Sequence, residues 1–365
     1  MSEKAVVKSV DPIKTLDDML PKTSNNKNKL FRIGISANLS GHTRELYTGV
    51  AIAVNEYLKK KDRLYDIEVL WEKSSFDKDS TLKAANQLVN RGAEAVIGHL
   101  SANQSLVAAT IYSDIDIPFL APGTSHPLLT EQGFDNILRV CGRDEEMAYE
   151  MVHLVDKLTA NTSLKIVYQE NSYGNQLSKL LRKSILEKGL SLKTSILIND
   201  NIVSEIDDRD TLLFAGTYEG ALLLTEKLAK ANFTGTVIFG DDIFVADFPY
   251  LTSKHDGLKL FTISTKKDLC GINYKNFENK YKEIASLKPA AYSVTSYIAT
   301  KILLNNISLL KKHGCKRFIN SLKNGVVVEG LEEVSFSPKG DLLEFEWDVY
   351  EMKAGDFIKL NGSDR

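Results

Sequence analysis

The sequence predicts an α/β protein made of two doubly wound parallel-sheet lobes. From residue 31 onward, short β-rich apolar runs alternate with longer segments of helical periodicity. Such alternation is typical of βαβ units around a parallel sheet. A second series of the same kind begins near residue 144, and a chain of 365 residues has about the length of two domains.

The elements of the first series follow from spacing and capping signals. Polar and apolar residues alternate over 66–71, and Asp77 is placed to cap the helix that follows. The predicted strands of this series are 31–36, 66–71, 93–98 and 117–121. Its predicted helices are 43–60, 77–91 and 101–113.

The second series is followed by helices that must return to one of the two cores. Its strands are predicted at 164–168, 193–198, 211–215 and 235–239, and its helices at 144–159, 173–188 and 218–231. Late helices are predicted at 274–286, 289–312 and 315–324, with strands near 325–336 and 344–352. The chain therefore crosses between its domains more than once.

Composition excludes several classes of protein. Lys and Arg number 46 against 48 Asp and Glu, a formal charge of −2, which argues against a nucleic-acid partner. No run approaches the ~20 apolar residues of a membrane-spanning helix, so direct membrane insertion is not expected. The cysteines Cys141, Cys270 and Cys315 lie far apart, which encodes neither a disulfide framework nor a zinc site.

Residues 1–29 are polar and are predicted to be a disordered lead-in, with a short docking helix over 10–20 as the alternative. They hold no apolar stretch of the about 7–15 residues that a secretory signal needs. The chain as written is therefore expected in the cytoplasm. A periplasmic or extracellular location is the alternative if a signal was removed before this numbering begins.

Motifs for catalysis are missing from the sequence. We find no GxxxxGK[ST] phosphate loop, no GxGxxG after the first strand, no HExxH and no GxSxG. The six histidines show no paired spacing. We therefore expect no enzyme, no cofactor and no metal site.

Small polar segments instead follow three predicted strands, where open parallel sheets bind ligands. Ser101, Ala102 and Asn103 begin a helix whose free N–H groups could hold a carboxylate, although Ser101 could simply cap that helix. Gly123 and Ser125 follow another strand, and turn chemistry alone could explain them.

The third strand end carries two carboxylates, Asp241 and Asp242. A carboxylate opposite an anion-binding helix start is what a zwitterionic α-amino acid requires. Capping of the following helix is the alternative role. The residues thus indicate a small-molecule ligand, an amino acid or a related small polar solute.

Four segments resemble the leucine/isoleucine/valine-binding protein family, the type I periplasmic solute receptors of ABC importers. They are IGHLSANQS at 97–105, IYSDIDIPFLAPGTSHPLLTEQGF at 111–134, NSYGNQL at 171–177 and SPKGDL at 337–342. The correspondence runs in the family's order from residue 31 to about residue 357. The segments are specific in combination, although each alone is weak.

The resemblance implies two lobes joined by a three-strand hinge, which close over a ligand. The first lobe is then expected at 30–141 plus 264–335, and the second at 142–263 plus 336–365.

Site residues follow from the same resemblance. Ser101, Ala102 and Asn103 fall at the carboxylate-binding helix start. Gly123 and Ser125 fall where a carbonyl and a hydroxyl meet the amino group or the carboxylate. The second lobe supplies a cleft tyrosine, an aromatic contact and the acid for the ammonium, which fall on Tyr173, Thr217 or Tyr218, and Asp242.

The sequence departs from the family at several of these positions. Ala102 stands where serine is common, and Asp242 is one methylene shorter than the usual glutamate. A cysteine pair of the family is missing, which agrees with a reducing compartment. Two roles are thus open: a transport receptor that docks on an ABC permease, and a cytoplasmic sensor read by a regulatory partner.

Overall fold

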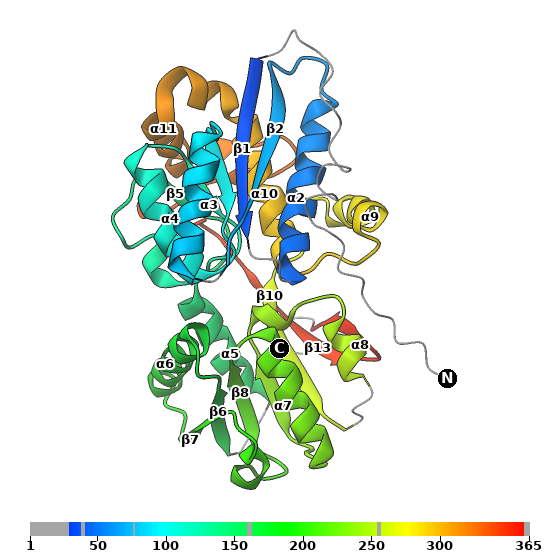
Figure 1. Cartoon of the computed structure of the whole chain (residues 1–365). Helices are drawn as coiled ribbons and strands as arrows, with labels where there is room; N and C mark the ends of the chain where they lie inside the picture. Colours follow the sequence, from blue (N-terminus) through cyan, green and yellow to red (C-terminus); the bar gives the residue numbers. More distant parts are fainter. Residues whose placement is uncertain (1–28, 38–40, 76, 159–162, 254–256, 361–365) are drawn as a thin grey trace.

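The computed structural model describes residues 29–37, 41–75, 77–158, 163–253 and 257–360. Figure 1 shows two α/β units, one above the other, each built on its own sheet. We call the unit on the five-stranded sheet the first lobe and the unit on the seven-stranded sheet the second lobe. Residues 1–28, which hold the predicted lead-in and docking helix, lie outside the described residues.

All the strand pairs of the first sheet are parallel, in the order β2-β1-β3-β4-β5. The strands are β1 (Lys29–Ala37), β2 (Tyr65–Lys73), β3 (Ala95–Gly98), β4 (Phe119–Ala121) and β5 (Ile137–Arg139). Alternate strand residues face opposite sides, so each face carries its own apolar cluster. The helices on one face are α2 (Gly41–Leu58), α9 (Tyr274–Ala285), α10 (Ala291–Asn305) and α11 (Ile307–Lys323), and those on the other are α3 (Lys78–Asn90) and α4 (Ala102–Asp114).

The second sheet has the order β14-β13-β10-β9-β8-β6-β7. Its parallel part is β6 (Leu164–Tyr168), β7 (Leu192–Leu197), β8 (Thr211–Ala215), β9 (Thr236–Phe239) and β10 (Lys259–Thr265). The antiparallel strands β13 (Trp347–Lys353) and β14 (Asp356–Lys359) complete one edge. One face packs on α5 (Asp144–Leu158) and α6 (Ser172–Glu187), the other on α7 (Tyr218–Lys230) and α8 (Phe248–Thr252).

Along the described chain, the backbone passes between the lobes three times: from β5 to α5, from β10 to α9, and from the short sheet of β11 (Val326–Val327) and β12 (Glu333–Val334) to β13. Figure 1 shows β10 and β13 running through the junction, where they pair antiparallel. This arrangement confirms the predicted fold class, two parallel-sheet lobes joined by three crossovers. The residue boundaries predicted for the lobes stay a prediction.

The SPKGDL segment at 337–342 is a strap that ties this third crossover to the first. Arg139 on β5 is fully buried and donates from Nε to Asp341 Oδ1 at 2.7 Å. Backbone bonds add to the ion pair, because Arg139 N donates to Gly340 O and Leu342 N donates to Arg139 O. Gly340 has φ +102°, and a Cβ there would lie 2.3 Å from the Ile137 carbonyl oxygen, so glycine is required. The motif therefore holds two of the three hinge crossings together.

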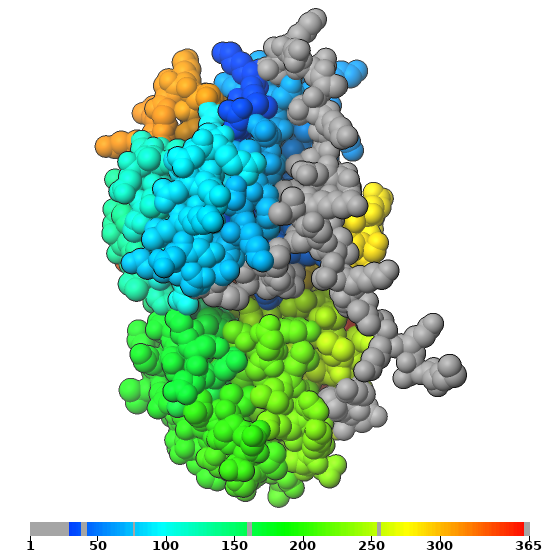
Figure 2. All heavy atoms as spheres, viewed as in Figure 1, coloured from blue at the N-terminus to red at the C-terminus, as the bar shows by residue number. Residues whose placement is uncertain are grey.

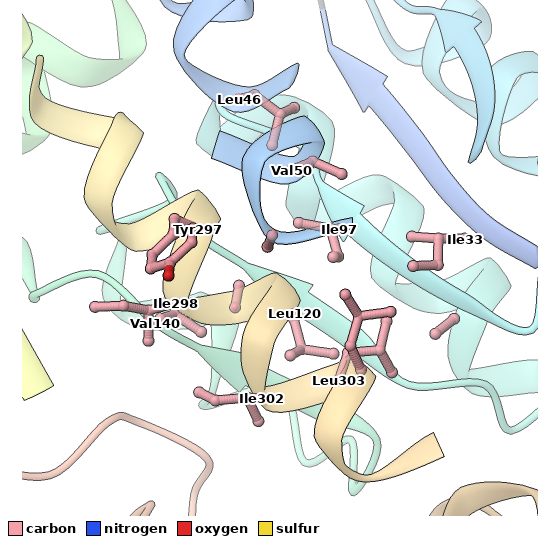
Figure 3. Packing of buried hydrophobic residues seen from close by; sticks show 14 of the residues in the cluster. Ile33, Leu46, Val50, Ile97, Leu120, Val140, Tyr297, Ile298, Ile302 and Leu303 are labelled. Atoms are coloured by element: carbon pink, nitrogen blue, oxygen red, sulfur yellow. The ribbon is translucent and has the colours of Figure 1, made fainter. Parts of the chain in front are cut away.

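Helices α2 and α10 approach each other closely over the first sheet, as the packing in Figure 3 shows. Gly49 makes this approach possible, since a Cβ there would lie 2.7 Å from the Ser293 carbonyl oxygen and 2.9 Å from Ser296 Cβ. The cluster beneath the two helices includes Ile33, Leu46, Val50, Ile97, Leu120, Ile298 and Leu303.

Gly49→Ala tests this contact, because two effects of opposite sign compete. Alanine gains about 1 kcal/mol of helix propensity. Overpacking against a backbone oxygen costs about 1–3 kcal/mol. We expect the clash to win and the free energy of unfolding, measured in urea, to fall by about 1 kcal/mol. A gain of stability would mean that the two helices separate freely.

The structure corrects the predicted elements at a few places. The predicted helix 289–312 is two helices, because the side-chain amides of Asn305 and Asn306 donate to the carbonyls of Lys301 and Ile302 and end α10. The predicted break before residue 315 is the non-helical Gly314 inside α11. Strands β5, β10 and β14 are missing from the predicted set; β5 has only three residues and ends on a charged one.

Candidate functional site

The carboxyl ends of several parallel strands meet the junction of the lobes, and most of the predicted site residues follow them. In the first lobe, β3 leads to Ser101 and β4 leads to Gly123. In the second lobe, β6 leads to α6 with Tyr173, and β9 leads to Asp242. Figure 2 shows the first lobe in blue and cyan meeting the green second lobe where grey atoms do not cover the junction.

At the start of α4, Ser101 does cap the helix. Its Oγ accepts from Gln104 N at 3.4 Å and donates to Gln104 Oε1 at 2.8 Å. Ala102 is half-buried and Asn103 is exposed, and both stand in the first helical turn, where N–H groups lack helical partners. This turn can hold an anion through its backbone, with the Ser101 hydroxyl already engaged.

Gly123 and Ser125 lie deeper, under the lobe junction. A Cβ at Gly123 would lie 2.9 Å from Leu100 Cδ2 and 3.2 Å from Tyr292 Cδ1, so the Tyr292 ring packs directly over this glycine. The Ser125 carbonyl accepts from Asp144 N at 3.0 Å, and its hydroxyl bonds to the Asp144 carboxylate. Both predicted residues thus contact groups that the sequence analysis did not select.

Thr217 and Tyr218 begin α7, and their side chains have partners of their own. Thr217 Oγ1 lies 3.1 Å from Gln169 Oε1 and 3.0 Å from Glu219 Oε2. The Tyr218 hydroxyl donates to Asp247 Oδ1 at 3.0 Å. The Tyr218 backbone N–H is the part that reaches the strand end, where it donates to Asp242 Oδ2 at 2.7 Å. Tyr218 thus holds Asp242 in place through its backbone N–H.

Asp242 also joins the two lobes. His42, near the start of α2 in the first lobe, places Nε2 3.3 Å from Asp242 Oδ1 and 3.2 Å from its carbonyl oxygen. Burial alone would raise the pKa of Asp242, but the bonds from His42 and from Tyr218 N hold it below its ordinary value. Burial would lower the pKa of His42, yet Glu45 and Asp242 raise it well above 6.5. The pair is therefore charged near neutral pH.

Glu45 and Tyr292 complete this contact on the first lobe. Glu45 Oε1 lies 2.9 Å from His42 Nδ1, and Glu45 Oε2 accepts from Tyr292 N at 2.7 Å. The rings of His42 and Tyr292 meet edge to face with centroids 4.7 Å apart. The imidazole is thus fixed between two carboxylates, one from each lobe.

Two further carboxyl groups lie in the second lobe beside this contact. Asp144 and Asp241 are 1% and 2% exposed, and one oxygen of each, Oδ1, has no hydrogen-bond partner in the part of the chain that the structure describes. Burial and neighbouring carboxylates raise the pKa of Asp241 to about 8, and burial raises that of Asp144 to about 6. The Tyr173 hydroxyl is also buried and lies against the Asp241 carboxyl group, with which it interacts.

The sequence matches the periplasmic binding protein family over residues 31–356. The chain belongs to this family. The Leu/Ile/Val-binding protein BraC3 of Rhizobium johnstonii is 23% identical over 345 residues, which cover 89% of this chain and 92% of that protein. The resemblance to the leucine/isoleucine/valine-binding proteins is thereby confirmed.

Solved structures share the fold of this periplasmic binding protein. The leucine-binding protein LivK of Thermotoga maritima has a TM-score of 0.77 at 21% identity and covers 92% of this chain and all of its own. LivJ of Streptococcus pneumoniae, solved with isoleucine, has a TM-score of 0.79 at 15% identity, with coverages of 91% and 100%. A solute-binding protein of R. palustris, solved with benzoate, has a TM-score of 0.77 at 14% identity, with coverages of 91% and 96%.

In this family member, the sequence analysis missed His42, Glu45, Asp144 and Tyr292. Asp144 begins the helix predicted at 144–159, but strand β5 before it was not predicted, so the rule that selected Asp242 did not point to it. The others come from helices α2 and α10, which are about 250 residues apart in the chain. Only the packing of α2 on α10 brings them together.

No helix in the described parts of the chain has the length and hydrophobicity needed to cross a bilayer.

Proposed function

We propose that this chain is the solute-binding component of an ABC-type amino-acid transport system. It takes up a small polar solute with an amino group, an amino acid or an amide-like compound, between its two lobes. One observation carries the proposal: His42 of the first lobe contacts Asp242, the strand-end acid of the second lobe, beside two further buried carboxyl groups. The names of the relatives, leucine- and Leu/Ile/Val-binding proteins, support the same class of ligand.

Closure of the hinge would bring two kinds of group onto the solute. The first turn of α4 offers N–H groups and a positive helix end to a carboxylate. The second lobe offers carboxyl groups to an ammonium, in a place from which closure removes water. The residues that we propose to line the cleft are Ser101, Ala102, Asn103, Gly123, Ser125, Tyr173, Thr217, Tyr218 and Asp242.

A thermal-shift screen against the twenty L-amino acids, their amides and small carboxylates tests this function. At 100 times its Kd, a single-site ligand adds about 2.7 kcal/mol of stability. This corresponds to a rise in Tm of about 5 °C or more. We expect a response to one or more α-amino acids or amides. A response to benzoate-like acids alone would contradict the amino-group ligand, and silence throughout would contradict solute binding.

Transport is distinguished from sensing by the partner. A transport receptor associates with a membrane permease in the presence of ligand, whereas a cytoplasmic sensor would associate with a soluble regulatory protein. Crosslinking in the native cell, with and without the ligand found above, separates the two. Recovery of a permease is the result expected here, and recovery of a soluble regulator alone would overturn the transport role.

A further inference from the structure

We propose that the amino group of the solute binds between Asp144 and Asp241 against the Tyr173 hydroxyl, and that Asp242 instead holds the lobes together through His42. This inference rests on the proposed function and names the residues that receive the amine. The resemblance implies Asp242 for that role, but its carboxylate already accepts from His42 and from the Tyr218 N–H. The neighbouring acids Asp144 and Asp241 each have one carboxyl oxygen without a hydrogen-bond partner in the described chain.

The first argument is that two buried carboxyl oxygens lack partners beside a buried tyrosine hydroxyl. Asp144 Oδ1 and Asp241 Oδ1 are buried and form no hydrogen bond within the described chain, and the Tyr173 hydroxyl lies against Asp241. The three groups come from the starts of α5 and α6 and from the end of β9, and they interact electrostatically with one another. A buried carboxyl oxygen without a partner costs free energy, so two in one place point to an absent donor.

The second argument is the balance of charge around the two acids. The charged groups that face Asp241 are Asp242, Asp144 and His42, and those that face Asp144 are Arg139, Glu145 and Arg143. Each of these cations has its own carboxylate: His42 has Glu45 and Asp242, Arg139 has Asp341, and Arg143 has Asp341, Glu131 and Glu145. The described residues therefore leave Asp144 and Asp241 without a matched positive charge.

The third argument identifies the cation as an ammonium group. An ammonium has three N–H donors, enough for both unpartnered carboxyl oxygens and for the tyrosine oxygen beside them. The Tyr292 hydroxyl of the first lobe interacts electrostatically with Asp241 and Tyr173, so an aromatic residue of the first lobe lies near the proposed amine site. A metal ion is a poorer fit, since no group of three or more His, Cys, Asp or Glu side chains in the described residues forms a metal site.

The test compares Asp241→Asn with Asp242→Asn, and uses Asp200→Asn as the control, because that carboxylate is 99% exposed. The probes are the L-amino acid that binds most tightly among the twenty and its analogue without the α-amino group. Titration calorimetry gives the Kd for both probes on each protein. We expect Asp241→Asn to weaken binding of the amino acid about 30-fold or more, because the loss of one partner of a buried charge pair has an effect of this order.

The comparison of the two probes separates this assignment from a general weakening of closure. The preference for the amino acid over its deaminated analogue should fall more in Asp241→Asn than in Asp242→Asn, and it should stay at the wild-type value in Asp200→Asn. An unchanged preference in Asp241→Asn, or its loss only in Asp242→Asn, would overturn the inference and leave the proposed function standing. A wild-type protein that binds none of the twenty amino acids would overturn both.

Stability of the ligand-free protein gives a second readout. Asp241→Asn removes a buried carboxyl group that has no cation, so we expect the Tm at pH 8 to rise while affinity falls. A residue kept for binding rather than for folding behaves in this way. A fall in Tm would mean that Asp241 supports the fold, and would also overturn the inference.

Discussion

Arg139→Met is expected to lower the free energy of unfolding by about 3–5 kcal/mol, the usual effect of removing one partner of a buried ion pair. The guanidinium is fully buried on β5 and donates to Asp341 Oδ1 at 2.7 Å. Its other bonds go to the carbonyls of Thr124, His126 and Pro127 and to the hydroxyl of Thr130. Methionine fills much of the volume but leaves these acceptors unpaired in the interior.

The matched control is Arg32→Met, which removes an ion pair of equal length from the surface. Arg32 Nε lies 2.7 Å from Glu68 Oε2, and both side chains are more than 40% exposed. Solvent screening limits that pair to about 1 kcal/mol or less. Urea unfolding of both variants measures the difference. Equal losses would contradict the view that the strap at 337–342 anchors the hinge through Arg139.

His42→Gln is expected to destabilise the protein in a pH-dependent way, by about 1–3 kcal/mol near pH 6, the size of a hydrogen bond between charged groups. The pKa of His42 is raised above its ordinary 6.5 in the folded protein, so its contribution is fully present below pH 6.5. That contribution is lost as the pH rises through the raised pKa. The pKa of Asp242 is lowered from 3.8, so on the acid side the contribution is lost only below that value.

Thermal unfolding of wild type and His42→Gln at pH 6 and pH 9.5 checks this window. The Tm difference should be largest at pH 6 and should shrink at pH 9.5. His313→Gln, an exposed histidine on α11, is the control and should show no such trend. A difference of the same size at both pH values would mean that His42 acts by packing on Tyr292 rather than by its charge.

The alternation of strands and helices could be predicted from the sequence because local residue patterns determine it. Period-2 and near-3.6 spacing placed β2 and α2, and Asp77 was correctly identified as the cap of α3, where it accepts from Ser80 N at 2.8 Å. The same patterns did not reveal the end of α10 at Asn306, where side-chain amides compete for helix carbonyls. They also did not reveal β10, although residues 261–264 alternate between apolar and hydroxyl side chains as a strand does.

Only part of the candidate site could be predicted from the sequence, for a different reason. Polar residues after β3, β4 and β9 could be selected because the carboxyl ends of parallel strands share one edge of a sheet. The sequence by itself therefore determined the fold class, the family resemblance and the strand ends that carry the site. It did not contain the contact between His42 and Asp242, which are 200 residues apart in the chain.

The tertiary structure alone decided which of these acids are already paired and which are not. Asp241 and Asp242 are neighbours with the same chemistry, yet Asp242 pairs with an imidazolium from the other lobe, whereas Asp241 is buried without an ion pair of its own among the described residues. The physical reason is that the pairing and burial of a carboxylate in one lobe depend on which side chains of the other lobe lie at the junction. Local periodicity fixes where a carboxylate stands in its own element, and only the packing of both lobes fixes its partner.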